Sequence, residues 1–158
     1  MKVVIIIPCY NEADRLDTNK FINYLSHNTH LHFLFVDDGS TDSTNLVIHQ
    51  LVSKFSSQVF LLTNETNKGK AESVRLGVLE SYKMNPDYIG FLDADLAAPI
   101  GEIDNLLKII KNDKTKEVVF ASRIQLIGSE INRNYFRHFI GRLFATSVAL
   151  FLKIRIYD

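Results

Sequence analysis

The chain has 158 residues, enough for one domain with a hydrophobic core, and its 46% hydrophobic and 23% charged residues are typical of a globular protein. The formal net charge is zero, so the composition does not indicate a nucleic-acid partner. The single cysteine, Cys9, excludes an internal disulfide and fits a reducing compartment, and no stretch reaches the roughly 20 apolar residues of a membrane span. We therefore expect a cytoplasmic protein with one domain over residues 1–158.

Short apolar runs alternate with amphipathic stretches along the chain. The runs rich in β-branched and aromatic residues predict strands at 3–7, 31–36, 59–62, 88–92 and 117–121. The stretches with helical spacing predict helices at 14–27, from Ser40 or Ser43 to 55, at 71–82, around 103–110 and at 135–152, with a polar loop at 122–134. We expect a central first strand, a buried fourth strand, and a third helix whose apolar face is Ala71, Val74, Val78 and Tyr82. The alternation indicates an α/β domain with a mostly parallel sheet.

Polar or glycine-containing clusters follow each of the first four predicted strands, at residues 8–12, 37–40, 67–70 and 93–95. Right-handed crossovers place the carboxyl ends of parallel strands at one edge of the sheet, and ligands bind at that edge in such proteins. The spacing alone therefore predicts that four loops converge on a small-molecule site.

Asp93 and Asp95 end the apolar run at 88–92. Because side chains alternate along a strand, both carboxylates can lean to the same side. Two carboxylates at the mouth of a buried strand repel each other and are costly to desolvate, and a divalent cation or hydrogen-bond donors would relieve both penalties. The alternative is a polar strand end that leads into a turn.

Two common phosphate-binding patterns are absent from the sequence. The loop after the first strand lacks Gly-x-Gly-x-x-Gly, and Gly69-Lys70 is followed by Ala71 where a phosphate loop would need Ser or Thr. The predicted site offers acids and a lysine. Acids suit the hydrogen-bond donors of a base or ribose, or a metal ion that binds a diphosphate.

Four motifs occur in a fixed order: Pro-x-Tyr-Asn-Glu at 8–12, Asp-Asp-Gly-Ser-x-Asp at 37–42, Asn-x-Gly-Lys at 67–70 and Asp-Ala-Asp at 93–95. Together they resemble the family two glycosyltransferases, which have the GT-A fold. Residues 121–123, 136–137, 141–142 and 156–158 resemble the polyprenyl-phosphate sugar synthases within that family. The resemblance implies a three-layer sandwich with a mostly parallel central sheet. Those enzymes continue past the position of Asp158, so we interpret the chain as truncated.

The resemblance also implies roles for individual residues. The residues that would bind the nucleotide are Pro8, Tyr10, Glu12, Asp37, Asp38, Lys70 and Asp93. Asp95 would hold Mg2+ or Mn2+, which stabilises charge on the departing nucleoside diphosphate, and Gly39 would serve backbone geometry. The structural alternatives are a packed aromatic lid for Tyr10, a helix first-turn acid for Glu12 and a solvated lysine for Lys70.

Two further features concern the metal and the acceptor. Ala97 stands where the synthases often carry a polar residue, so water would complete the metal's coordination. Arg123 and Arg137 resemble the arginines that hold the acceptor phosphate by bidentate donation, the alternative being a basic surface near a helix start. A lipid phosphate would attack as an anion and needs little general-base help. The apolar residues 143–152 would lie in a membrane interface or, alternatively, cover the sheet.

The resemblance implies an inverting, metal-dependent glycosyltransferase. It would transfer a hexose from a nucleotide-diphosphate sugar, UDP-glucose in preference to GDP-mannose, to a polyprenyl phosphate at the cytoplasmic face of a membrane. The alternatives are transfer to a glycan hydroxyl and a catalytically inactive nucleotide-sugar binder. A phosphohydrolase is disfavoured, because its nucleophile would follow the first strand, where Pro8 stands.

Overall fold

The computed structural model describes residues 1–121 of the chain, and no helix in that part is long and apolar enough to cross a membrane. The chain divides into two compact units, Met1–Asn105 and Leu106–Asp158, each of which makes most of its contacts within itself. The first unit contains four strands, three complete helices and the start of a fourth helix. A single domain over residues 1–158 stays a prediction.

Four parallel strands form the sheet of the first unit, in the order β3-β2-β1-β4. Their bounds are Val3–Cys9 for β1, Leu31–Asp37 for β2, Val59–Thr63 for β3 and Tyr88–Phe91 for β4. β1 is central, as predicted, with Val3 opposite Leu31 on one side and opposite Tyr88 on the other. At the far end of β2, Asp37 lies opposite Thr63. Because every pairing is parallel, the carboxyl ends of all four strands lie at one edge.

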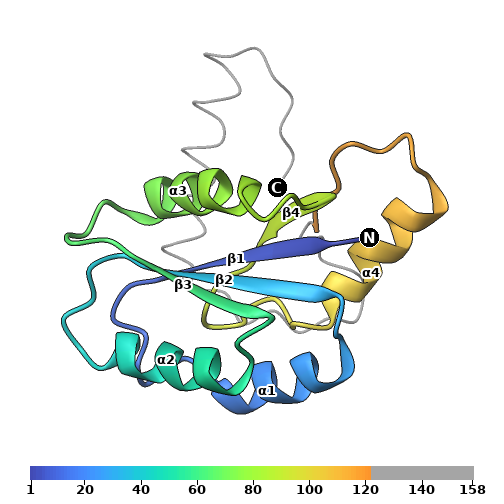
Figure 1. The fold of residues 1–158 in the computed structure, drawn as a ribbon. Coiled ribbons are helices and arrows are strands. Elements are labelled where there is room, and N and C mark those ends of the chain that lie inside the picture. Colours follow the sequence, from blue (N-terminus) through green and yellow to red (C-terminus); the bar gives the residue numbers. More distant parts are fainter. Residues whose placement is uncertain (122–158) are drawn as a thin grey trace, which may run out of the picture. The chain divides into compact units, whose positions relative to one another are not determined.

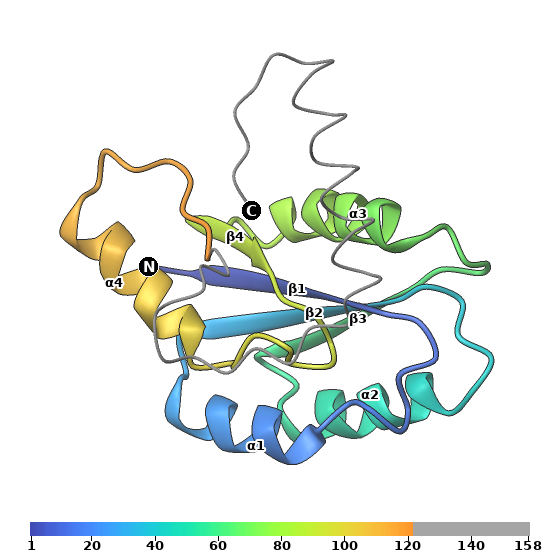
Figure 2. The ribbon, with the colours of Figure 1, turned by 180° about the vertical axis from the view of Figure 1, so that it is seen from behind.

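The helices cover both faces of this sheet. Their bounds are Thr18–His27 for α1, Thr44–Lys54 for α2, Lys70–Tyr82 for α3 and Glu102–Asn112 for α4. α1 and α2 pack on one face and α3 packs on the other (Figure 1, and from behind in Figure 2). This three-layer arrangement confirms the predicted α/β sandwich. Right-handed connections produce it, because the strand order runs one way from β1 to β3 and α3 leads back across the sheet to β4.

The core lies on both sides of β1 and β2, whose residues are almost all buried, as expected for parallel strands covered on two faces. On the α1 side, Phe21 makes edge-to-face contacts with Phe33 and Phe35, at centroid distances of 5.7 and 5.3 Å. On the opposite side, Val78 of α3 packs against a buried cluster formed by Val4, Ile6, Leu34 and Val36.

The buried face of α3 is made of small residues, Ser73, Gly77 and Ser81, which is not the face that the apolar pattern predicted. In the predicted set, Ala71 and Tyr82 are exposed and Val74 and Val78 are half-buried. The reason is that large side chains of the sheet, those of Ile6 and Val36, lie directly against this face of the helix. A Cβ atom on Gly77 would lie 2.6 Å from Ile6 Cγ2 and 3.1 Å from Val36 Cγ2.

The first helix begins later than the sequence pattern indicates, and the second begins directly after Ser43, one of its two predicted caps. α1 begins at Thr18 and not near residue 14, because Asp17 caps it by accepting a hydrogen bond from the Lys20 N–H (3.2 Å). α2 has Ser43 at its N-cap position, but the Ser43 side chain makes no capping hydrogen bond. Asp42 Oδ1 accepts from the Thr44 N–H instead (2.9 Å).

Two predictions about strands are wrong. β4 is half-buried and not fully buried, and its last residue, Phe91, is 60% exposed, because within the described residues β4 pairs only with β1. Residues 117–121 form no strand, and Val118 and Phe120 are exposed. A strand needs a partner for its backbone groups, which a local apolar pattern does not supply. The predicted loop at 122–134 and helix at 135–152 lie outside the described residues.

The start of α4 is fixed within the first unit by a hydrogen bond from Tyr24 Oη to Asp104 Oδ1 (3.0 Å). The helix has Ile103 and Leu107 buried at the predicted spacing. In the second unit, residues 106–112 continue α4, and residues 113–121 have no regular structure beyond a turn.

Asp38 fixes the loop between β3 and α3. Its carboxylate is buried; Oδ1 accepts from Asn64 Nδ2 (2.8 Å) and the Lys68 N–H (3.0 Å), and Oδ2 accepts from the Gly69 N–H (2.8 Å). Burial alone would raise the pKa of Asp38, but the hydrogen bonds from Lys68, Asn64 and Gly69 outweigh it and the pKa is lowered. The loop is therefore held by the ionised carboxylate.

Gly39 allows this loop to pass close to the end of β2. Its φ is +70°, and a Cβ atom there would lie 2.7 Å from the carbonyl carbon of Thr66. This geometry matches the backbone role expected for Gly39, since both the conformation and the space require a residue without a side chain.

We predict that Gly77→Ala destabilises the protein by about 1 kcal/mol and Gly77→Val by roughly 2 kcal/mol or more. The added methyl groups press on Ile6 and Val36, and this overpacking outweighs the gain in helix propensity. Chemical denaturation measures the effect. Gly101→Ala is the control, because its Cβ would meet no atom within 4 Å. An unchanged or higher stability of Gly77→Ala would contradict the packing described.

We predict that Asp38→Asn destabilises the fold by about 2 kcal/mol at pH 7, because an amide nitrogen would replace an acceptor facing backbone N–H groups. The folded pKa of Asp38 is lowered, so its stabilisation is present above the unfolded pKa of about 4 and is lost as the pH falls through the folded value. The stability difference between the wild type and Asp38→Asn should therefore shrink in acid. Urea denaturation from pH 7 to 3 measures this difference, and Asp14→Asn, at an exposed position, is the control. A difference in unfolding free energy that grows in acid would contradict the prediction.

Candidate functional site at the carboxyl edge of the sheet

Backbone hydrogen bonds join the first three loops where they leave the sheet. The Asp38 N–H donates to the Cys9 carbonyl (2.8 Å), and the Asn64 N–H donates to the Asp37 carbonyl (2.8 Å). These bonds continue the strand pairing past the ends of β1, β2 and β3. The loops therefore begin side by side, as the spacing of the polar clusters predicted.

Asn11 joins the loop after β1 to the loop after β2. Its N–H donates to Ser40 Oγ (3.0 Å), and its Oδ1 accepts from the Thr41 N–H (2.9 Å). The φ of Asn11 is +53°, a left-handed conformation that asparagine tolerates better than most residues. This residue lies within a motif singled out in the sequence, but the pattern assigned it no role.

A second connection runs through Thr44, the first residue of α2. The Glu12 N–H donates to Thr44 Oγ1 (2.8 Å), and Thr44 Oγ1 donates to Asp42 Oδ1. Asp42 Oδ2 also accepts from the Ala13 N–H (3.2 Å). Hydrogen bonds, that from the Thr44 hydroxyl first, lower the pKa of Asp42. Asp42 thus holds the backbone of residues 12 and 13 against α2.

Three predicted nucleotide-binding residues lie at this edge. Pro8 is half-buried, and Tyr10 is 44% exposed, so its ring is not packed in the core. The Asp37 carboxylate is buried; Oδ1 accepts from the Ser40 N–H (3.0 Å) and Oδ2 from Asn45 Nδ2 (2.9 Å). A carboxylate has about four lone-pair sites, so two accepted hydrogen bonds leave capacity for a ligand.

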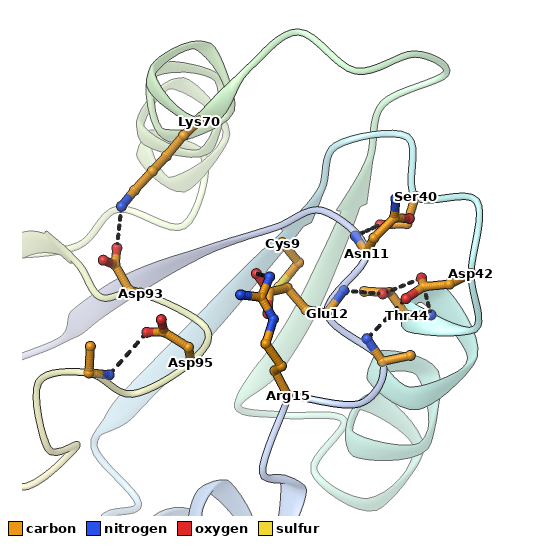
Figure 3. Close-up of polar contacts among 12 residues, drawn as sticks. Cys9, Asn11, Glu12, Arg15, Ser40, Asp42, Thr44, Lys70, Asp93 and Asp95 are labelled. Carbon is orange, nitrogen blue, oxygen red and sulfur yellow. Dashed lines mark hydrogen bonds and ion pairs between the residues drawn. The ribbon is translucent and has the colours of Figure 1, made fainter. Parts of the chain in front are cut away.

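Glu12 precedes α1 and is not a residue of its first turn, because the helix begins at Thr18. Its Oε1 accepts from Arg15 Nη2 at 2.6 Å, and its Oε2 is buried with no hydrogen-bond partner in residues 1–121 (Figure 3). Burial raises the pKa of Glu12, Arg15 opposes this, and the charges of Asp95, Asp42 and Asp93 raise it further. These couplings place Glu12 near the two acids that follow β4.

Lys70 and Asp93 bring the third and fourth loops together. Lys70 Nζ, at the start of α3, lies 2.6 Å from Asp93 Oδ1, and both side chains are partly exposed (Figure 3). Asp95 is exposed, and its Oδ1 accepts from the Ala97 N–H (3.0 Å). Between them Leu96 has a φ of +51°, a strained conformation for a leucine. The strain fits a turn that must present Asp95 outward.

Asp95 is exposed, and only its Oδ1 accepts a hydrogen bond within the described residues, so Oδ2 is open to a metal ion. Residues 1–121 contain no group of three or more His, Cys, Asp or Glu side chains that could hold one by themselves. A single carboxylate does fit Mg2+, which proteins often bind through one or two carboxylates together with substrate phosphates and water. Arg123 and Arg137, the predicted acceptor-phosphate residues, lie outside the described residues.

The sequence did not reveal every residue that shapes this edge. Asn11 and Asp42 stand within the recognised motifs, but their bonding partners are 29 and 30 residues away in the chain. The sequence analysis assigned no role to Arg15 or Thr44, and both contact Glu12 in the structure.

The chain matches the family model for glycosyl transferase family 2 over residues 4–156. A dolichyl-phosphate beta-glucosyltransferase of Dictyostelium discoideum is 32% identical over 151 residues, which cover 86% of this chain and 45% of that protein. A dolichol-phosphate mannosyltransferase of Pyrococcus furiosus is 32% identical over 144 residues, which cover 90% of this chain and 39% of that protein. The chain therefore spans less than half the length of these curated relatives.

Solved structures share the fold at low sequence identity. A mannosyltransferase from Pyrobaculum calidifontis, in complex with GDP-Man and Mn2+, has a TM-score of 0.58 and 23% identity over 69% of this chain and 32% of its own. TarS of S. aureus, in complex with UDP-GlcNAc, has a TM-score of 0.54 and 23% identity over 71% of this chain and 32% of its own. The predicted GT-A fold is confirmed. A family model that covers almost the whole chain and an architecture that agrees with it establish that this protein belongs to glycosyltransferase family 2.

Proposed function

We propose that the protein is an inverting glycosyltransferase that transfers a hexose from a nucleotide-diphosphate sugar to a polyprenyl phosphate. The observation that carries this proposal is the meeting of four loops at one sheet edge, where the Asn11–Ser40 and Lys68–Asp38 hydrogen bonds and the Lys70–Asp93 ion pair join each loop to the next. Relatives named for dolichyl-phosphate glucosyl transfer and dolichol-phosphate mannosyl transfer support the same class of acceptor.

The nucleoside is assigned to the loops after β1 and β2. Asp37 has open acceptor capacity, Glu12 has an open buried oxygen, and Tyr10 offers an exposed ring on which a base can stack. Pro8 keeps the end of β1 rigid beside them. Asp38 acts on the site through the loop it holds, because its oxygens already accept from Asn64, Lys68 and Gly69.

The diphosphate is assigned to the side of the site formed by Lys70, Asp93 and Asp95. Lys70 is paired with Asp93, and its ammonium can donate to a phosphate oxygen as well, since it has three donors. Asp95 would hold Mg2+ or Mn2+ with its open Oδ2, its other oxygen being fixed by the Ala97 N–H. When bound, the metal supplies charge stabilisation for the departing nucleoside diphosphate.

For the acceptor, we keep Arg123 and Arg137 as the residues expected to hold its phosphate, with the reaction at the cytoplasmic face of a membrane and the protein associated peripherally. A polyprenyl phosphate is an anion at neutral pH and can attack the anomeric carbon directly, so this reaction does not need a strong general base. UDP-glucose is the favoured donor over GDP-mannose.

Titration calorimetry with UDP and with GDP, each with and without Mn2+, tests donor binding by the chain. We expect metal-dependent binding, tighter for UDP. Transfer is then assayed with the complete protein, using labelled UDP-glucose or GDP-mannose and either a polyprenyl phosphate or a glycan. Product on the lipid phosphate supports the proposal, product on the glycan supports the alternative acceptor, and binding without transfer supports an inactive nucleotide-sugar binder.

We predict that Asp95→Asn removes most of the Mn2+ dependence of nucleotide binding and weakens UDP binding in Mn2+ by at least roughly tenfold, because a neutral amide is a poor ligand for a hard cation. Asp113→Asn is a matched control, since Asp113 makes the same hydrogen bond to the N–H two residues ahead, that of Thr115 (3.1 Å). If Asp95→Asn kept the full Mn2+ dependence, the metal ligand would lie elsewhere.

A further inference from the structure

The ion pair between Arg15 and Glu12 differs from the other pairs of its kind. Five salt bridges in residues 1–121 join an acid to a base three positions later. In four of them the acid is 37–43% exposed, as expected for a solvated surface pair. The Glu12 side chain is only 14% exposed, although Arg15 is 61% exposed. In this pair the Glu12 carboxylate is therefore largely shielded from solvent, while the Arg15 guanidinium lies at the surface.

The surroundings of Glu12 disfavour an ionised carboxylate. It is desolvated, and the charged groups that act on it from the neighbouring loops are Asp42, Asp93 and Asp95. Cys9, on the end of β1, is a further neighbour, and burial is the first cause that raises the pKa of its thiol, followed by the charges of Glu12 and Asp37. Among the described residues, Arg15 is the one cation that opposes this effect on Glu12. The Arg15 guanidinium thus opposes the rise in the Glu12 pKa that burial and the three acids cause.

The geometry also fixes which oxygen of Glu12 is open. The backbone is held because the Glu12 N–H donates to Thr44 and the Glu12 carbonyl accepts from the Arg15 and Leu16 N–H groups. Arg15 occupies Oε1, which leaves Oε2 buried without a partner in the described chain. A buried carboxylate oxygen without a donor is unfavourable, and a ligand N–H or O–H placed there would satisfy it.

We propose that Arg15 is a positioning residue of the donor site, which holds the Glu12 carboxylate so that Oε2 accepts a hydrogen bond from the nucleoside part of the donor. Arg15 acts through Glu12 and not by its own contact with the ligand. The inference rests on the proposed function, because it takes the ligand of this edge to be a nucleoside diphosphate.

The experiment compares Arg15→Gln with Arg75→Gln in the complete chain. Arg75 pairs with Glu72 at the same spacing on exposed positions of α3, so it is a matched control. Binding of UDP, GDP and inorganic pyrophosphate is measured by calorimetry in Mn2+. We expect Arg15→Gln to weaken nucleotide binding by roughly fivefold or more and to leave pyrophosphate binding and the melting temperature unchanged. We expect Arg75→Gln to change none of these.

Two further variants separate an indirect role from a direct one. If Arg15 acts through Glu12, Glu12→Gln and Glu12→Gln/Arg15→Gln should bind the nucleotide equally, whereas a direct contact of Arg15 would make their losses add. Arg15→Lys should recover part of the affinity, because it keeps the charge. Additive losses, or full nucleotide affinity in Arg15→Gln, would overturn the role of Arg15 and leave the proposed function standing. If the wild type bound neither UDP nor GDP, both would be overturned.

Discussion

The candidate site depends most on the hydrogen bonds that the Asp38 carboxylate accepts. It is buried at the end of β2 and accepts hydrogen bonds from the Asn64 side chain and from two backbone N–H groups of the loop after β3. That loop leads into α3, whose first residue, Lys70, pairs with Asp93 after β4. The Asp38 carboxylate thereby links the loops after β2 and β3, and the Lys70–Asp93 ion pair adds the loop after β4.

The acids at this edge divide into two groups by what already occupies their oxygens. Asp38 and Asp42 are used by the protein itself, since each accepts several hydrogen bonds from neighbouring loops. Glu12 and Asp95 each keep one oxygen without a partner in the described chain. Acids whose oxygens already accept several hydrogen bonds hold the loops in place, and acids with an oxygen that accepts none are available to a ligand. Under the proposed function, this division separates the motif residues of this chain that would contact the donor from those that hold the loops.

The sheet imposes a matching constraint on α3. The side chains of Ile6 in β1 and Val36 in β2 point toward α3. Small residues on the helix, such as Ser73 and Gly77, allow it to lie close to the sheet. This packing fixes the position of α3 above the sheet. It therefore also fixes where Lys70 begins the helix, and with it the reach of its ammonium toward Asp93.

The alternation of strands and helices, the central β1, the convergence of four polar loops and the family could all be predicted from residues alone, because they follow from local periodicity and from motifs at fixed spacing. Other features could not. The small buried face of α3, the pairing of β4 with β1 alone within residues 1–121 and the absence of a strand at 117–121 depend on partners distant in the chain. The same holds for Arg15 and Asn11: a hydrogen bond or ion pair between loops depends on how the chain brings them together, which no local pattern of residues encodes.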